Sequence, residues 1–235
     1  DVLPSYIHSY VERDVRQLIN VENLSIFQKF LQLCAGRIGQ LLNIAALSTE
    51  CSISQTTAKK WLSLLEASYV LFLLRPYHVN FNKRVTKSPK LFFYDTGLAS
   101  SLLKIRSFQD LALSQHRGHL FECLMLSDIL KQYFNRGMQP PVYFWRDLNG
   151  RIEIDCLIDL GTKLIPIEIK SGSTATKNFF QDLNKWNKIA ETSSKDSYVI
   201  YSGELEQTYH TGKFIGWKSA GNIVNQIDPQ HLKAT

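Results

Sequence analysis

The sequence predicts a mixed α/β protein, in which a winged helix-turn-helix precedes a three-layer α/β domain with a mixed sheet. The first half shows helical spacing of apolar residues and then two short strand-like segments. The second half runs helix, three strands, helix, strand, which is typical of a sheet covered by helices on both faces. No apolar run among the 235 residues approaches the roughly 20 needed to cross a bilayer, so no membrane partner is expected.

Four segments are predicted along the chain. Residues 1–25 contain a charged helix, and residues 26–95 form the winged helix-turn-helix. A helical connector covers residues 96–116, and the α/β domain covers residues 117–235. The boundaries follow the changes of hydrophobic period along the sequence.

The four cysteines are scattered, with no C-x-x-C pair among them. This spacing argues against a disulfide framework or a metal–thiolate site. Buried free thiols are the expected state. Together with the lack of a signal-like start, this pattern leads us to expect a cytoplasmic protein.

The helix-turn-helix is predicted from a short helix over residues 40–49, a tight turn, and a longer helix over residues 55–68. Ser54 is placed to cap the second helix. Four apolar residues fall at i, i+3, i+4 and i+7 and should face a core: Ala58, Trp61, Leu62 and Leu65. The outward side chains proposed to contact DNA are Gln55, Thr56, Lys59 and Lys60.

A basic loop is predicted to join two strands, over residues 69–74 and 91–94, as the wing. It contributes Lys83, Arg84 and Lys87 to the predicted DNA-binding set. The net charge of the chain is +6, and the excess is concentrated between residues 54 and 90, where Glu66 is the single acid. Such a concentrated positive field favours a nucleic-acid partner, while a solvated lysine face remains the alternative.

Two strand-like segments in the second half, residues 152–159 and 165–170, carry acids and a lysine. Each alternates apolar and polar residues, and a strand places successive side chains on opposite faces. The predicted polar faces carry Glu153 and Asp155 on the first segment, and Glu168 and Lys170 on the second.

A loop over residues 160–163 would join these segments as a hairpin. The resulting register opposes Asp159 to Leu164, Asp155 to Glu168, and Glu153 to Lys170. Directly opposed Cβ atoms lie roughly 5 Å apart. Two carboxylates at that separation repel each other unless a positive charge lies between them. A divalent cation is therefore expected between the acids, with the lysine beside it.

Glu122 lies on the apolar stripe of a strong helix predicted over residues 116–134. A carboxylate on an inward face is costly unless it is paired or bound to a metal. A core salt bridge and a metal ligand therefore both remain open for Glu122.

Glu122 on a helix, Asp155 on a strand, and Glu168 with Lys170 on the next strand resemble the core motif of the PD-(D/E)xK, or restriction-endonuclease-like, nuclease superfamily. The resemblance implies that Asp155 and Glu168 bind Mg²⁺ (or Mn²⁺) and that Lys170 positions the attacking water. It also implies that Glu122 is an auxiliary metal ligand. All four residues would then be catalytic, on a restriction-endonuclease-like fold.

A second resemblance covers nearly the whole chain. The motifs that carry it are residues 39–43, Lys83-Arg84, residues 87–91 leading into 94–98, Gly118 with Glu122, residues 143–146, and residues 153–155. They resemble the C-terminal half of a prokaryotic AAA+-type ATPase family, in which a P-loop module precedes a winged helix and a nuclease-like domain of unknown function.

This resemblance implies that residues 1–25 are the tail of a preceding ATPase module, which would be a partner within the parent chain. The present sequence contains no G-x-x-x-x-G-K-[ST], so ATP is expected to bind only to that module.

Two functions follow as expectations. The first is a Mg²⁺-dependent DNA endonuclease, positioned on double-stranded or branched DNA by the winged helix. The alternative is a non-catalytic region that binds DNA or protein and regulates the ATPase, because a nuclease fold does not by itself establish activity.

Overall fold

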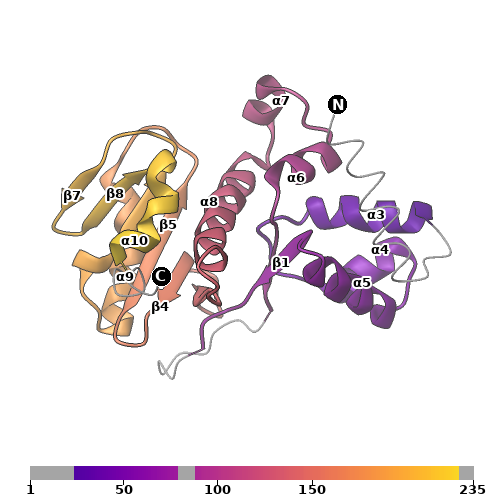
Figure 1. The fold of residues 1–235 in the computed structure, drawn as a ribbon, viewed down its shortest axis with the longest axis horizontal. Coiled ribbons are helices and arrows are strands. Elements are labelled where there is room, and N and C mark those ends of the chain that lie inside the picture. The colour runs from indigo at the N-terminus through magenta and orange to yellow at the C-terminus, as the bar shows by residue number, and fades with distance from the viewer. Residues whose placement is uncertain (1–23, 79–87, 228–235) are drawn as a thin grey trace. The chain divides into compact units, whose positions relative to one another are not determined.

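The computed structural model describes residues 24–78 and 88–227, which fall into two compact units (Figure 1). Of the described residues, the first unit contains 24–73 and 88–124, and the second contains 74–78 and 125–227. The charged helix predicted within residues 1–25, and the wing residues Lys83, Arg84 and Lys87, lie outside the described ranges.

The first unit contains the predicted helix-turn-helix. Its helices are α3 (Leu24–Ala35), α4 (Ile44–Cys51) and α5 (Gln55–Ala67). Ser52 ends α4 in a left-handed conformation with φ 55°, and the Ser54 side chain accepts a hydrogen bond from the Thr57 N–H at 3.0 Å. These local signals set the tight turn and the start of α5.

The α3 and α5 helices meet in an aromatic core. The rings of Phe27 and Phe30 both lie edge-on to Trp61 of α5, with centroids 5.2 Å away. Ala58, Leu62 and Leu65 are buried beside Trp61. The four positions predicted to face a core therefore do so, which leaves the opposite side of α5 in solvent.

A two-stranded sheet follows α5, as expected for a winged helix. It pairs β1 (Leu71–Leu74) with β2 (Lys90–Phe93), and Leu41 adds an antiparallel bridge to Lys90. The next helices are α6 (Thr96–Leu102), α7 (Phe108–Leu113) and α8 (Arg117–Phe134). Among the described residues, no helix is long and apolar enough to span a membrane.

The second unit is built on a mixed six-stranded sheet, in the order β3-β4-β5-β6-β8-β7. The strands are β3 (Val142–Arg146), β4 (Glu153–Asp159), β5 (Leu164–Lys170), β6 (Tyr198–Tyr201), β7 (Gln207–Tyr209) and β8 (Gly212–Gly216). The three strands β3, β4 and β5 pair antiparallel, β5, β6 and β8 pair parallel, and β7 is antiparallel to β8. This confirms the predicted mixed sheet.

Helices cover the sheet of the second unit. The crossover from β5 to β6 contains η2 (Lys177–Phe180), α9 (Gln181–Ala190) and η3 (Ser194–Asp196), and the described chain ends with η4 (Trp217–Asn222) and α10 (Ile223–Ile227). Phe180, Leu183 and Trp186 pack with sheet residues in one buried cluster. The sheet residues in that cluster are Ile154, Leu157, Val199, Tyr201 and Phe214. Cys156, Ile165 and Ile167 are buried as well, so both faces of the sheet are covered.

Residues 75–77, here called the edge segment, follow the outer edge of β3. Phe144 donates its N–H to the Arg75 carbonyl at 3.1 Å, and Tyr77 donates its N–H to the Phe144 carbonyl at 2.7 Å. The Tyr77 hydroxyl also lies 3.2 Å from Oδ2 of Asp159. The edge segment thus satisfies backbone groups that an edge strand would otherwise expose.

All four cysteines are buried and free, as the sequence predicts. Burial raises the pKa of the Cys34 thiol far above its usual value. The Cys34 thiol is therefore an unreactive packing group.

Candidate functional site

A β-bulge in β4 places two residues, Asp155 and Cys156, opposite the single residue Phe144 of β3. The pairs on either side are Tyr143–Leu157 and Trp145–Ile154. Strict alternation along this strand was predicted, and the bulge breaks it, so Ile154 and Leu157 join the same core cluster. Bulges re-aim side chains and are common beside functional sites. The bulge therefore gives Asp155 a direction that a regular strand would not.

The hairpin of β4 and β5 has the predicted register, from Asp159 opposite Leu164 to Cys156 opposite Ile167. The predicted register would next place Asp155 opposite Glu168. In the structure, the Asp155 carboxylate accepts a hydrogen bond from the Ile169 backbone N–H at 2.8 Å. This hydrogen bond fixes the aspartate against β5.

Glu153 forms an ion pair with Arg146, the residue opposite it on β3, with 3.2 Å between Oε2 of Glu153 and Nε of Arg146. Glu153 therefore takes part in a cross-strand ion pair between β4 and β3.

Glu168 is the most unusual polar residue of the second unit. It is 5% exposed, and its Oε1 accepts a hydrogen bond from the Lys170 ammonium. Its Oε2 is buried and has no hydrogen-bond partner among the described residues. Burial raises the pKa of this carboxyl well above its usual range, the Asp155 carboxylate adds to the rise, and Lys170 opposes it. A buried oxygen without a donor is a natural position for a cation.

Lys170 is the last residue of β5, and 38% of its side chain is exposed. Glu168 and Lys170 share one face of β5, as predicted, and pair in register with Val199 and Tyr201 of β6. The ammonium thus lies between the buried carboxyl and solvent.

Asp155 and Glu168 fit a hard divalent ion such as Mg²⁺. Both supply carboxylate oxygens, and Glu168 contributes the unpartnered one. Within residues 24–78 and 88–227, no group of three or more His, Cys, Asp or Glu side chains is arranged to hold a metal. Two protein ligands with water in the other positions is a coordination that Mg²⁺ accepts.

Glu122 lies in the first unit, where its carboxylate forms a buried ion pair. Its Oε1 lies 3.0 Å from Nζ of Lys90, and its Oε2 lies 3.5 Å from Nδ1 of His119. Burial raises the pKa of Glu122, but Lys90 and His119 outweigh it, so the pKa lies below its usual value. Of the two alternatives that the sequence leaves open, the structure shows the salt bridge, and metal ligation by Glu122 stays a prediction.

Sequence reasoning missed Lys90 and His119 as the partners of Glu122. Lys90 precedes the apolar run of β2 and is itself 3% exposed. A lysine at the start of a strand whose other residues are all buried is the signal that points to a buried carboxylate partner.

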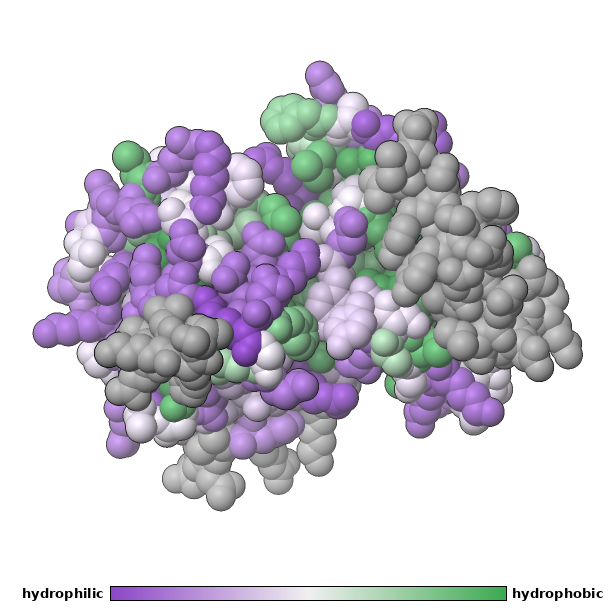
Figure 2. Space-filling view, in the orientation of Figure 1, coloured by the Kyte–Doolittle hydropathy of each residue, from purple (hydrophilic) through white to green (hydrophobic). Residues whose placement is uncertain are grey.

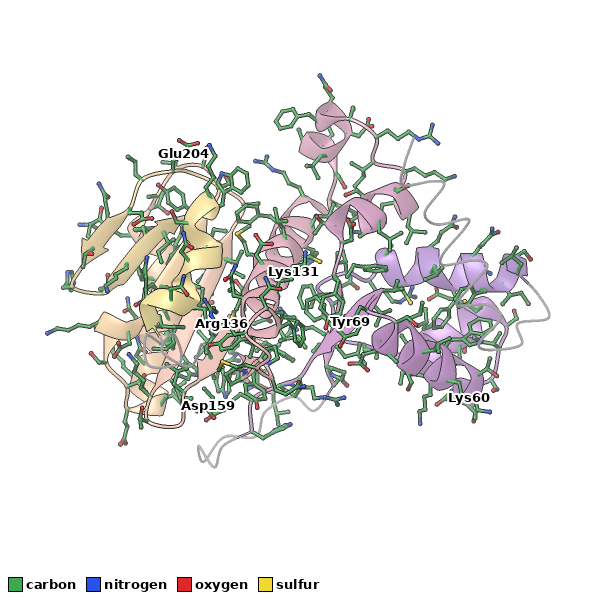
Figure 3. The ribbon with its side chains drawn as sticks, viewed as in Figure 1. Lys60, Tyr69, Lys131, Arg136, Asp159 and Glu204 are labelled. Atoms are coloured by element: carbon green, nitrogen blue, oxygen red, sulfur yellow. The ribbon has the colours of Figure 1, made fainter. Side chains whose placement is uncertain are left out.

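The predicted DNA-binding residues of α5 lie on its solvent side. Gln55, Thr56, Lys59 and Lys60 are all exposed. Figure 3 labels Lys60, whose side chain projects from the outer side of α5. Polar and basic side chains along an exposed second helix can reach both base edges and phosphates.

Replacing Glu168 with glutamine should make stability rise with pH relative to the wild type. The folded pKa of Glu168 is raised, so the wild type loses stability as pH increases from the ordinary glutamate value toward the folded value. Between pH 4.5 and pH 8, the difference in free energy of unfolding should grow by up to about 1.4 kcal/mol per pH unit. Urea denaturation across this range measures it.

The matched control for that series is Glu206→Gln, because Glu206 is exposed. Because this side chain is in water in both the folded and the unfolded state, the difference in free energy of unfolding between Glu206→Gln and the wild type should stay nearly constant across the pH range. A flat difference for Glu168→Gln across the range would contradict the raised pKa.

Comparison with known proteins gives similarity to two consecutive families. Residues 1–109 match the family model "Domain of unknown function (DUF8612)", and residues 117–219 match "Domain of unknown function (DUF4143)". An uncharacterized protein of Mycobacterium tuberculosis and one of Mycobacterium bovis are each 31% identical over 169 residues. The alignment covers 72% of this chain and 37% of each relative. The chain thus spans little more than a third of the length of the curated relatives that it matches, and resembles two adjoining domains of unknown function.

Proposed function

We propose that this chain is the DNA-cleaving region of a longer AAA+-type ATPase, with a Mg²⁺-dependent nuclease site at Asp155, Glu168 and Lys170. The observation that carries the proposal is the buried Oε2 of Glu168, which has no hydrogen-bond partner among the described residues. The Asp155 carboxylate raises the pKa of Glu168, and the Lys170 ammonium bonds its other oxygen.

The residues of the site have distinct roles in this proposal. Asp155 and Glu168 would hold the ion, and bound Mg²⁺ supplies a water of lowered pKa and stabilises charge on the phosphodiester. The Ile169 N–H keeps Asp155 oriented. Lys170, partly exposed at the end of β5, orients the attacking water and neutralises charge that develops on the phosphate.

The test is plasmid nicking together with Mn²⁺ binding measured by electron paramagnetic resonance. The wild type should bind Mn²⁺ and nick supercoiled plasmid with Mg²⁺. Asp155→Asn should lower the nicking rate at least about 100-fold, because the ion contributes several kcal/mol of charge stabilisation.

The control is Asp196→Asn, an aspartate of η3 whose side chain is 40% exposed and lies 3.7 Å from Nζ of Lys163. Its nicking rate should match the wild type. Equal nicking by the wild type and Asp155→Asn would refute the nuclease assignment.

A second candidate is a non-catalytic region that binds DNA or protein and regulates the ATPase. The Lys90–Glu122 pair favours it, because the third acid of the nuclease motif is already neutralised within the first unit. In this case the winged helix carries the function, and the sheet of the second unit is a scaffold.

Charge reversal on α5 tests the DNA-binding role that both candidates share. Lys59→Glu with Lys60→Glu should weaken binding to a labelled duplex at least about tenfold and reduce the salt slope by about 2, since each phosphate contact contributes about 1. Fluorescence anisotropy at several salt concentrations measures both.

Lys188→Glu, on the exposed side of α9, is the control for charge. Binding that survives Asp155→Asn without any nicking by the wild type would favour the regulatory role. No binding by the wild type at low salt would point to a protein partner.

A further inference from the structure

The candidate site lies on the sheet face that α9 covers. On β5, Glu168 pairs in register with Val199 of β6, and directly opposed residues share one face of a sheet. Val199 belongs to the buried cluster in which Leu183 and Trp186 of α9 pack. Lys170, two residues beyond Glu168, faces the same way. The face that carries Glu168 and Lys170 is therefore the one under α9.

Asp182 brings a third carboxylate toward this site from the first turn of α9. It directly precedes the buried Leu183, and its own side chain is 35% exposed. Burial is the largest cause of the raised pKa of Glu168, the Asp155 carboxylate adds to the rise, and the Asp182 charge adds to it as well. Asp182 therefore lies within electrostatic reach of Glu168, and a cation in the site would offset the repulsion among these acids.

The described residues do not provide a third direct metal ligand. Within residues 24–78 and 88–227, no group of three or more His, Cys, Asp or Glu side chains is arranged to hold a metal. A Mg²⁺ ion held by two carboxylates keeps several waters, and the groups that accept hydrogen bonds from bound ligands orient them. A carboxylate at the edge of the site is suited to accept such a bond.

We propose that Asp182 accepts a hydrogen bond from a water on the Mg²⁺ held by Asp155 and Glu168, and thereby strengthens the binding of that ion. The inference rests on the metal site of the proposed function. It makes Asp182 a positioning residue, which acts on the ion through water.

The ion pair of Asp182 is compatible with this role. Nζ of Lys185 lies 2.7 Å from Oδ1 of Asp182, and a carboxylate accepts up to about four hydrogen bonds, so this contact leaves room for a water. Both side chains are partly exposed, and most of the visible surface of the second unit is hydrophilic in the same way (Figure 2).

Mn²⁺ binding to the full chain, followed by electron paramagnetic resonance, tests the proposal. Asp182→Asn should raise the Kd at least about tenfold, because the hydrogen-bond partners of metal ligands contribute about 10- to 100-fold to affinity. Water-proton relaxation at saturating Mn²⁺ should give the same number of bound waters in the variant and the wild type. Loss of a direct ligand would instead add a water.

Two variants are the controls. Lys185→Met removes the partner of Asp182 but keeps the carboxylate, so Mn²⁺ should bind at least as tightly as in the wild type. Asp196→Asn is the matched aspartate, because Asp196 is also partly exposed and paired with a lysine, and it should leave the Kd unchanged. The urea midpoint of Asp182→Asn in EDTA should match the wild type, which excludes a loss of folding.

A Kd for Asp182→Asn within about twofold of the wild type overturns the proposal, since the partner of a ligand contributes more than that. An added water on Mn²⁺, or an equal loss in Lys185→Met, overturns it as well. A wild type that binds no Mn²⁺ would overturn both this proposal and the metal site. If Asp182→Asn weakens Mn²⁺ binding but the wild type nicks no plasmid, the nuclease function falls and the role of Asp182 stands.

Discussion

Replacing Glu122 with alanine should lower the free energy of unfolding by about 3 to 5 kcal/mol, because the change leaves a buried ammonium without its partner. The side chains of Lys90 and Glu122 are 4% and 9% exposed, and their charged atoms lie 3.0 Å apart. A water in the vacated space would supply no negative charge to compensate the ammonium. Urea denaturation followed by circular dichroism measures the loss.

Two controls separate this effect from a general cost of substitution. Glu50→Ala removes a surface carboxylate that pairs with Arg37, and should cost less than about 1 kcal/mol. Replacing both buried partners, with Glu122→Leu and Lys90→Met, should recover most of the stability, since an apolar pair carries no stranded charge. A loss below about 1 kcal/mol for Glu122→Ala would contradict the structural role of the pair.

Replacing Lys170 with methionine should reduce Mg²⁺-dependent nicking at least about 100-fold without weakening Mn²⁺ binding. General acid–base and positioning groups contribute about 10²- to 10⁴-fold to rates. The ammonium occupies Oε1 of Glu168, so its removal frees that oxygen for a cation. Nicking rates at saturating Mg²⁺ and Mn²⁺ titrations measure the two effects separately.

The matched control is Lys177→Met, because Lys177 is exposed on η2 in the next part of the chain. It should leave nicking and Mn²⁺ binding unchanged. If Lys170→Met nicks at the wild-type rate, the lysine has no part in the chemistry. If the variant loses both nicking and Mn²⁺ binding, Lys170 supports the site structurally.

The helix-turn-helix could be predicted because its signals are local. The spacing of Ala58, Trp61, Leu62 and Leu65 and the cap at Ser54 lie within one short stretch, and the structure confirms both. The strands β7 and β8 could not be predicted. One is short and polar, and the other begins and ends with glycine, so neither shows strand alternation.

The hairpin of the candidate site could also be predicted, since a short loop sets the register of its two strands. The bulge at Asp155 could not be predicted. It arises where β4 pairs with β3, and the short loop between β4 and β5 does not set the register of that pairing. The partner of Glu122 was missed for a related reason. Lys90 lies 32 residues away along the chain, where no local periodicity relates the two.

The edge segment has a consequence for how this protein can be divided into expression fragments. A recombinant piece that starts at residue 117, where the sequence alone suggests a boundary, would contain every strand of the large sheet but not Arg75 or Tyr77. The edge strand β3 would then expose backbone N–H and C=O groups that residues 75–77 otherwise bond, and such an edge promotes aggregation. Residues 75–77 therefore belong in any piece that contains the large sheet, and activity assays belong on the longer chain.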